Sequence, residues 1–183
     1  MLYTFGFERV GVVISDLFFV DPNPREGQEG AERGVRLELR LLEHGELRGS
    51  IYSARPIEIG KPIWRADLLE LASGPPGSLN RAHHHPAFNG WEPGRRTFDP
   101  ELVADPVGWV GQQLADLQAV LERADVSDGD GDGDEFAADA KSLQDHAPEI
   151  MGVLRQLLDD VKAGKAAIGP DGDTPDSARN SWL

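Results

Sequence analysis

The residues best suited to chemistry lie between positions 73 and 99. This segment contains three of the chain's five histidines, in the run His83-His84-His85. Histidine exchanges a proton near neutral pH without special tuning, so a pair of histidines can act as general base and general acid. If the segment is extended, His83 and His85 point to one side and His84 points to the other.

A second pair of candidate residues precedes this segment. Arg65 and Asp67 lie in a predicted strand, where residues two apart share a face. The guanidinium could bind a phosphate, and the carboxylate could orient a histidine. We therefore predict a catalytic set for phosphodiester cleavage, made of His83, His85, Arg65 and Asp67. An ordinary Arg–Asp ion pair on a solvated sheet face is the alternative interpretation.

Four further residues of the segment are predicted to bind substrate: Arg81, Trp91, Arg95 and Arg96. Charged and aromatic side chains in a loop are well placed to contact a ligand. The same loop could instead bind a protein partner, because tryptophan and arginine are enriched in interface hot spots. Two imidazoles beside a carboxylate could also bind a divalent metal. Our preferred interpretation includes no metal and no cofactor, and the chain has no glycine-rich nucleotide-binding motif.

The order Arg-x-Asp followed by His-x-His resembles that of TumE-like proteins, which are small ribonuclease-like toxins of bacterial and archaeal toxin–antitoxin pairs. The resemblance covers residues 34–86, and the matching positions are Arg65, Asp67, His83 and His85. It implies a small α+β domain that cleaves RNA. Segments 7–11 and 83–86 are also similar to segments of uncharacterised archaeal and actinobacterial proteins, and that similarity implies no function.

Alternation of apolar and polar residues predicts an antiparallel meander of about five strands in residues 1–72. The run 35–41 alternates without interruption, which is typical of a half-buried strand. Gly45 is suited to a turn, after which the chain is expected to return over residues 47–54. The remaining strands are predicted at 3–8, 10–20 and 63–69.

Two C-terminal helices are predicted to pack on this sheet, which gives an α+β fold. Asp105 and Pro106 have the residue types of an N-cap and a first helical position, and apolar residues then recur every three or four positions to Leu121. A second helix is expected from about Pro148 to Gly164. We assign 73–99 as a loop of the same domain, 100–164 as its helical part and 165–183 as a disordered tail.

The charge of the chain is concentrated in its second half. The 183 residues carry a net charge of −14, yet residues 1–100 have 14 acidic and 12 basic side chains, against 18 and 6 in residues 101–183. Repulsion of nucleic acid is therefore expected mainly from the second half. Scarce lysine and abundant aspartate are typical of halophilic proteins, and equally of a high-GC genome. The absence of cysteine excludes disulfides and thiolate chemistry.

An acidic linker is predicted at residues 125–135, between the two helices. Its alternation of aspartate and glycine matches the first half of an EF-hand calcium loop, but we favour a flexible linker. No long apolar segment and no secretory leader are apparent, so we expect a cytoplasmic protein without a membrane partner. The favoured function is a toxin-like ribonuclease with an RNA partner. The alternatives are a non-catalytic adaptor with a protein partner and a histidine-based metal-binding protein.

Overall fold

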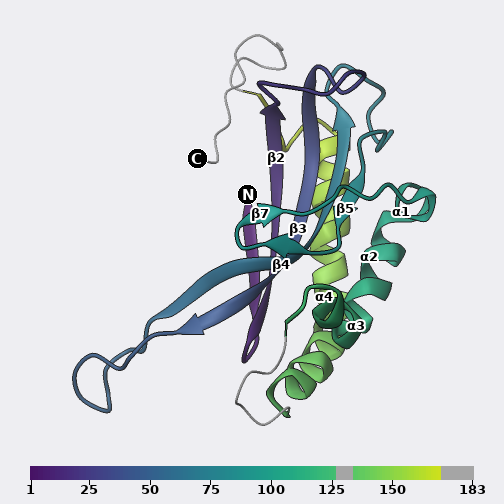
Figure 1. Cartoon of the computed structure of the whole chain (residues 1–183). Helices are drawn as coiled ribbons and strands as arrows, with labels where there is room; N and C mark the ends of the chain where they lie inside the picture. Colours follow the sequence, from purple (N-terminus) through teal and green to yellow (C-terminus); the bar gives the residue numbers. More distant parts are fainter. Residues whose placement is uncertain (127–133, 170–183) are drawn as a thin grey trace.

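A computed structural model of the chain describes residues 1–126 and 134–169 (Figure 1). Its main feature is a five-stranded antiparallel sheet with the order β1-β2-β3-β4-β5. These strands are β1 (Leu2–Gly6), β2 (Val10–Val20), β3 (Ala31–His44), β4 (Ile57–Leu71) and β5 (His83–His85). A small second sheet pairs β6 (Phe88–Asn89) with β7 (Glu92–Pro93). The predicted antiparallel sheet and α+β fold class are confirmed.

Helices cover one face of this sheet, and the β6–β7 hairpin crosses the other (Figure 1). Within the described residues the helices are α1 (Pro100–Ala104), α2 (Pro106–Ala115), α3 (Leu117–Arg123) and α4 (Asp134–Lys162). Aspartates 99, 105 and 116 cap the first three helices by accepting backbone N–H groups. No helix in this part of the chain is long and apolar enough to cross a bilayer.

The hydrophobic core lies between the sheet and the helices. In β3 and β4, Leu37 pairs with Ala66 and Leu39 with Trp64, and all four are fully buried beneath the helices. Trp64 also stacks on the α2 residue Trp109, with ring centroids 6.1 Å apart. Burial of each large apolar side chain stabilises the fold by about 1.5–3 kcal/mol. The intervening residues of the same strands point to the opposite face, and these are the charged ones.

The predicted return strand at 47–54 is wrong. These residues belong to the loop 45–56, in which Gly49 adopts a φ of 115° and the Ser53 N–H donates to the Ser50 carbonyl in a turn. The true return strand is β4, which begins at Ile57 and continues through the predicted strand 63–69. The return strand therefore starts ten residues later than predicted. The segment around residue 50 forms a turn, and alternation of apolar residues does not reveal that turn.

Both helix predictions need correction at their boundaries. The single helix expected from Pro106 to Leu121 is divided at Asp116, which ends α2 and caps α3. The second helix begins at Asp134, so Pro148 lies inside α4 rather than at its start. Phe136 and Leu143 extend the buried stripe upstream of the proline, and this packing outweighs the proline's cost of about 3 kcal/mol.

Asp139 of α4 joins the helix to the β1–β2 turn. Its carboxylate accepts the backbone N–H groups of Glu8, Arg9 and Val10 at 2.7–2.8 Å, and its side chain is buried. If Asp128 is counted as the first position of the calcium loop considered above, Asp139 falls at the twelfth, but here it accepts backbone N–H groups. Residues 128–133 of that loop and residues 170–183 of the predicted tail lie outside the described residues.

Candidate functional site

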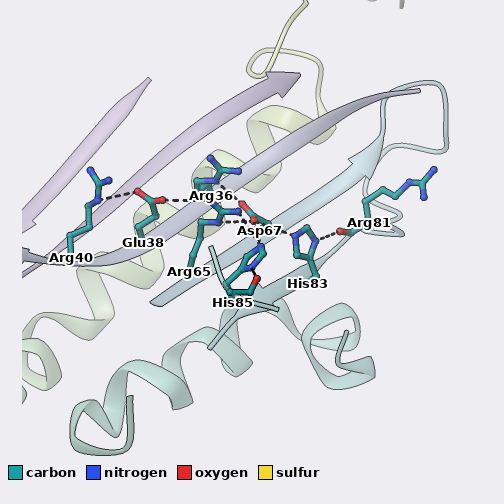
Figure 2. A network of polar contacts seen from close by, with 9 residues as sticks. Arg36, Glu38, Arg40, Arg65, Asp67, Arg81, His83 and His85 are labelled. Carbon is teal, nitrogen blue, oxygen red and sulfur yellow. Dashed lines mark hydrogen bonds and ion pairs between the residues drawn. The ribbon is translucent and has the colours of Figure 1, made fainter. Parts of the chain in front are cut away.

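The candidate site is built by strand register on the face of the sheet opposite the helices. Strand β5 pairs with β4 so that His83 lies opposite Asp67 and His85 opposite Arg65. On the other side of β4, Arg36 of β3 lies opposite the same Asp67. Residues two apart in a strand share a face, so five side chains from three strands meet there (Figure 2). The three histidines are extended, not part of a structureless loop.

Asp67 is the centre of this cluster. Arg36 Nε donates to its Oδ1 at 2.7 Å, and Arg65 Nε lies 2.8 Å from its Oδ2. The Nε2 atoms of His83 and His85 lie 3.4 and 3.5 Å from that same Oδ2. The Arg65 contact is close but poorly aligned, so Oδ2 makes no hydrogen bond of good geometry with any described residue. Oδ2 can therefore still accept a hydrogen bond.

The charges around Asp67 keep it ionised although it is only 1% exposed. Burial alone would raise the pKa of this carboxyl. The charge of Arg36, the two imidazoles and Arg65 outweigh burial and hold the pKa well below its usual range. For Arg65, burial is the dominant effect, and it lowers the pKa of the guanidinium despite the adjacent carboxylate.

Each histidine is oriented by a backbone carbonyl. His83 Nδ1 lies 2.8 Å from the Arg81 carbonyl, and His85 Nδ1 lies 2.8 Å from the Gly94 carbonyl. A carbonyl only accepts, so we assign a proton to Nδ1 in both rings. Arg65 Nη2 lies 3.1 Å from His85 Nε2 and can only donate, so this Nε2 is an unprotonated acceptor. The Nε2 of His83 faces Asp67 and is free to take a proton there.

The β6–β7 hairpin covers part of the site on the face of the sheet opposite the helices. Phe88 lies 5.6 Å from the guanidinium of Arg65, measured to its ring centroid, and its ring is 6.2 Å from that of His85. Gly90 turns the hairpin with a φ of 63°. Gly94 must be glycine because a Cβ at this position would lie 2.6 Å from the Ala87 carbonyl oxygen. The hairpin therefore both orients His85 and shields it.

On β3, next to Asp67 of β4, the charges alternate in the order Arg36, Glu38, Arg40 and extend the cluster (Figure 2). Glu38 lies 3.9 Å from Arg65 and 3.3 Å from Arg40. Not counting the histidines, three guanidinium groups against two carboxylates leave one net positive charge. Arg36, Glu38 and Arg40 also line a groove of about 260 Å³, together with Leu2, Val13, Ser15, Leu17 and Ile59. An anion is the ligand that this face attracts.

The four residues predicted to bind substrate are not gathered in the cluster. Arg81 donates to the carbonyls of Gly27 and Glu29, and Arg96 donates to the Gln28 side chain, so both hold the 21–30 loop. Arg95 is exposed. Trp91 is 65% exposed and lies beside the groove, where Arg40 packs 5.5 Å from its ring centroid. Of these four side chains, that of Trp91 packs on a groove residue, whereas Arg81 contributes to the site through the backbone carbonyl that orients His83.

His84 points to the helical face, as alternation predicts for the middle residue of an extended run. Its ring packs 4.8 Å from that of Trp109, and burial lowers the pKa of its imidazole. Because the sheet separates His84 from Asp67, it is a natural control for the two site histidines.

Sequence reasoning missed Arg36, Glu38 and Arg40 as members of the site. They are the charged half of the alternation that predicted the strand, which is a signal present in the sequence. The alternation shows that the three share a face, but it does not show that β3 lies beside β4 with Arg36 opposite Asp67. That pairing comes from the register of the sheet.

The arrangement allows two kinds of chemistry. Two imidazoles beside a cationic cluster can move protons on a bound phosphate. The donor atoms of Asp67, His83 and His85 also lie within 4.8 Å of one another, close enough to share a metal ion.

No family model matches this chain, and comparisons with curated proteins and with solved structures also found no match.

Proposed function

We propose that this protein is a phosphodiester-cleaving enzyme that acts on RNA, with His83 and His85 as its proton-transfer groups. The observation that carries the proposal is the convergence of both Nε2 atoms on Asp67 Oδ2, at 3.4 and 3.5 Å, beside two arginines. An Arg–Asp pair alone is common on sheet faces. Two imidazoles whose Nδ1 atoms are fixed by carbonyls, so that both Nε2 atoms face one carboxylate, are not required for a structural ion pair.

The roles of the two histidines follow from their hydrogen bonds. His85 Nε2 is unprotonated because it accepts from Arg65, and once Arg65 turns from it to the bound phosphate this Nε2 can take the proton from an RNA 2′-hydroxyl. The 2′-oxygen then attacks the adjacent phosphorus. A protonated His83, stabilised by Asp67, gives its Nε2 proton to the departing 5′-oxygen. The products are a 2′,3′-cyclic phosphate and a 5′-hydroxyl, and a final proton transfer between the histidines restores the enzyme.

Arginine supplies the electrostatic part of the mechanism. Arg36 and Arg40 line the groove, and their side chains are 27% and 21% exposed, so they can meet an incoming phosphate. Arg65 lies deeper, between Asp67 and His85. Guanidinium groups stabilise the charge that develops on the phosphate oxygens in the transition state.

The substrate reaches the histidines when the β6–β7 hairpin moves. The side chains of His83 and His85 are only 4% and 3% exposed; Phe88 of the hairpin packs on His85, and Phe98 packs on His83. The hairpin has short strands and is linked to the site mainly by the carbonyl of Gly94 and the ring contacts of Phe88. Local opening of such an element is a common step before catalysis.

The experiment is an RNA cleavage assay with matched histidine variants. Purified protein is incubated with a mixed-sequence RNA, with and without EDTA, and products are identified by mass spectrometry. We expect 2′,3′-cyclic phosphate ends with wild type and with His84→Ala, and loss of cleavage with His83→Ala and with His85→Ala. Intact RNA with folded wild-type protein, with or without divalent metal, would refute the proposal.

A metal-binding protein is the second candidate, favoured by the donor set of Asp67, His83 and His85. Metal-bound histidines usually donate their other ring N–H to a carbonyl, as both do here. The two arginines on Asp67 argue against it, because they compete with any cation for the carboxylate. Elemental analysis of untagged protein decides the matter. One zinc or other transition metal per chain, lost in His83→Ala, would favour this candidate over the first.

A further inference from the structure

The β3–β4 hairpin extends away from the rest of the molecule as an arm, defined here as residues 43–61 (Figure 1). The arm contains the last residues of β3, the loop 45–56 and the first residues of β4. Its base is joined to the sheet at Leu42, whose N–H donates to the Arg9 carbonyl. Beyond that point the two strands pair only with each other. A two-stranded ribbon alone is marginally stable in water, so this arm gains from a further contact.

Large apolar side chains are exposed along the whole arm. Ile51 and Tyr52 at its tip are 81% and 90% exposed, and Leu47, Ile57 and Ile59 are 45%, 61% and 39% exposed. Single exposed apolar residues are ordinary, but five within one projecting hairpin are a concentration that favours association. Among the described residues, these are five of the eleven large hydrophobic residues that are exposed.

The charge of the arm differs from that of the molecule that bears it. Residues 43–61 contain three acidic and three basic side chains, whereas the whole chain has a net charge of −14. Two copies of so acidic a chain repel each other over most of their surfaces. The arm is neutral and holds the contact at a distance from both acidic bodies. It is therefore the part of the molecule that a second copy can approach.

The charges within the arm are also ordered along its length. Glu43 and Glu58 lie directly opposite each other at the base, where like charges across a strand pair are destabilising. Lys61 also belongs to the base, which leaves a net charge of −1 there, and Glu46, Arg48 and Arg55 lie nearer the tip, where the net charge is +1. Neither glutamate has an ion-pair partner within residues 1–126 and 134–169. If two arms align antiparallel, the arginines of each tip reach the glutamates of the other base.

From these observations we propose that the arm is a homodimerisation element. Two copies pair through their arms about a two-fold axis, which aligns the arms antiparallel and closes the assembly at two chains. Ile51 and Tyr52 of each tip pack near Ile57 and Ile59 of the other base, and the arginine and glutamate pairs fix the direction. This assignment does not rest on the cleavage reaction proposed above, although Ile59 at the base also lines the groove beside Arg36, Glu38 and Arg40.

The first test measures the mass of the full chain by analytical ultracentrifugation over a range of concentrations. We expect a monomer–dimer equilibrium. The variant Ile51→Ser with Tyr52→Ser should raise its dissociation constant by about ten-fold or more, because each lost contact removes buried apolar area. The control Val103→Ser, at a 41% exposed position on α1, should leave the equilibrium unchanged. A monomer at all concentrations, or a dimer insensitive to the tip variant, overturns the proposal.

The second test probes the antiparallel alignment by charge reversal. Arg48→Glu with Arg55→Glu gives an arm that is acidic at both ends, and Glu43→Arg with Glu58→Arg gives one that is basic at both ends. Each variant alone should be mainly monomeric, and an equal mixture should form the heterodimer. A mixture that stays monomeric overturns the alignment. Binding of monomeric protein to phosphatidylcholine vesicles, lost in the tip variant, would assign the arm to a lipid surface instead.

Discussion

At the scale of single residues, Asp67 is the group on which the site depends. It is the one anion shared by Arg36, Arg65, His83 and His85, and it lies under the β6–β7 hairpin beyond the reach of bulk water. A buried carboxylate with two guanidinium partners contributes little net stability when intact, but its loss leaves charges unpaired. The stability of the sheet and the proposed proton transfer therefore both depend on the Asp67 carboxylate.

Asp67→Asn should destabilise the fold by about 3–5 kcal/mol, because it removes the nearest counter-charge of the buried Arg65 and of the partly buried Arg36. Urea unfolding measures the change in the free energy of unfolding. Asp145→Asn is the control, since it removes an exposed carboxylate in the i,i+4 ion pair with Lys141 and should have a small effect. Equal effects of the two substitutions would show that the Asp67 charge is not paired in the native protein.

The pH dependence of stability has a defined sign at this residue. The pKa of Asp67 is well below 3.8 in the folded state, so its carboxylate stabilises the fold fully above the unfolded pKa near 3.8. That contribution is lost as the pH falls below 3.8 toward the folded pKa. The difference in unfolding free energy between wild type and Asp67→Asn should shrink as the pH falls below about 4. A difference that grows as the pH falls from 4 to 2 would contradict the ionised assignment.

At the scale of elements, the β6–β7 hairpin and α4 place the site in different ways. The hairpin supplies the Gly94 carbonyl that fixes the ring of His85, and it covers the site with Phe88. Helix α4 stabilises the opposite face of the sheet and holds the β1–β2 turn through Asp139. One element controls access to the site and the other supports the sheet beneath it.

Phe88→Ala should loosen the hairpin and expose the site histidines. The ring of Phe88 packs on both Arg65 and His85, so its removal deletes the main side-chain contact of the hairpin with β4 and β5. Diethyl pyrocarbonate labelling followed by mass spectrometry should show faster modification of His85 in this variant. His146 is exposed on α4 and should react equally in both proteins. Unchanged labelling of His85 would show that Phe88 does not limit access.

Asp139→Ala should destabilise the fold by at least about 1–3 kcal/mol, because it removes the acceptor of three backbone N–H groups, one of them buried. Asp139→Asn keeps one acceptor oxygen and should lose less. Thermal or urea unfolding of both variants gives the order. If alanine is tolerated as well as asparagine, water replaces the carboxylate at the β1–β2 turn.

The elements differ in how well the sequence predicts them. The strand over 10–20 and the placement of His83 and His85 on one face follow from local patterns that the structure reproduces. The boundaries that failed, at the return strand and at Pro148, depend on tertiary packing and on turn geometry that a periodic pattern does not contain. The sequence did not predict that Arg36 of β3 contacts Asp67, because the register between two strands is a long-range property. The catalytic role of the site stays a prediction.

At the scale of the whole molecule, the charge of −14 is carried almost entirely by residues 101–183, while the site lies in the nearly balanced first half. Helices α1 to α4 cover one face of the sheet (Figure 1), and the cationic cluster lies on the other face (Figure 2). An RNA that approaches this face meets the three arginines before it meets the acidic helices. Separation of charge between the two faces makes the proposed polyanionic substrate compatible with an acidic protein.

The same charge predicts a response to salt. Self-repulsion among the acidic side chains is screened as ionic strength rises, since the Debye length falls from about 10 Å at 0.1 M to about 3 Å at 1 M. The melting temperature should therefore rise between dilute buffer and 1 M KCl, as measured by differential scanning fluorimetry. A melting temperature that does not change would remove the halophilic interpretation of the composition.

The central claim is that His83 and His85 transfer protons on a phosphodiester held at the arginine cluster. The most direct measurement is the initial rate of RNA cleavage by wild type, His83→Ala, His85→Ala and His84→Ala, each first shown to be folded by circular dichroism. The account predicts cleavage to 2′,3′-cyclic phosphate ends by wild type and His84→Ala, and a loss of about 100-fold or more in each of the other two. Equal rates in all four proteins, or no cleavage by any, would contradict it.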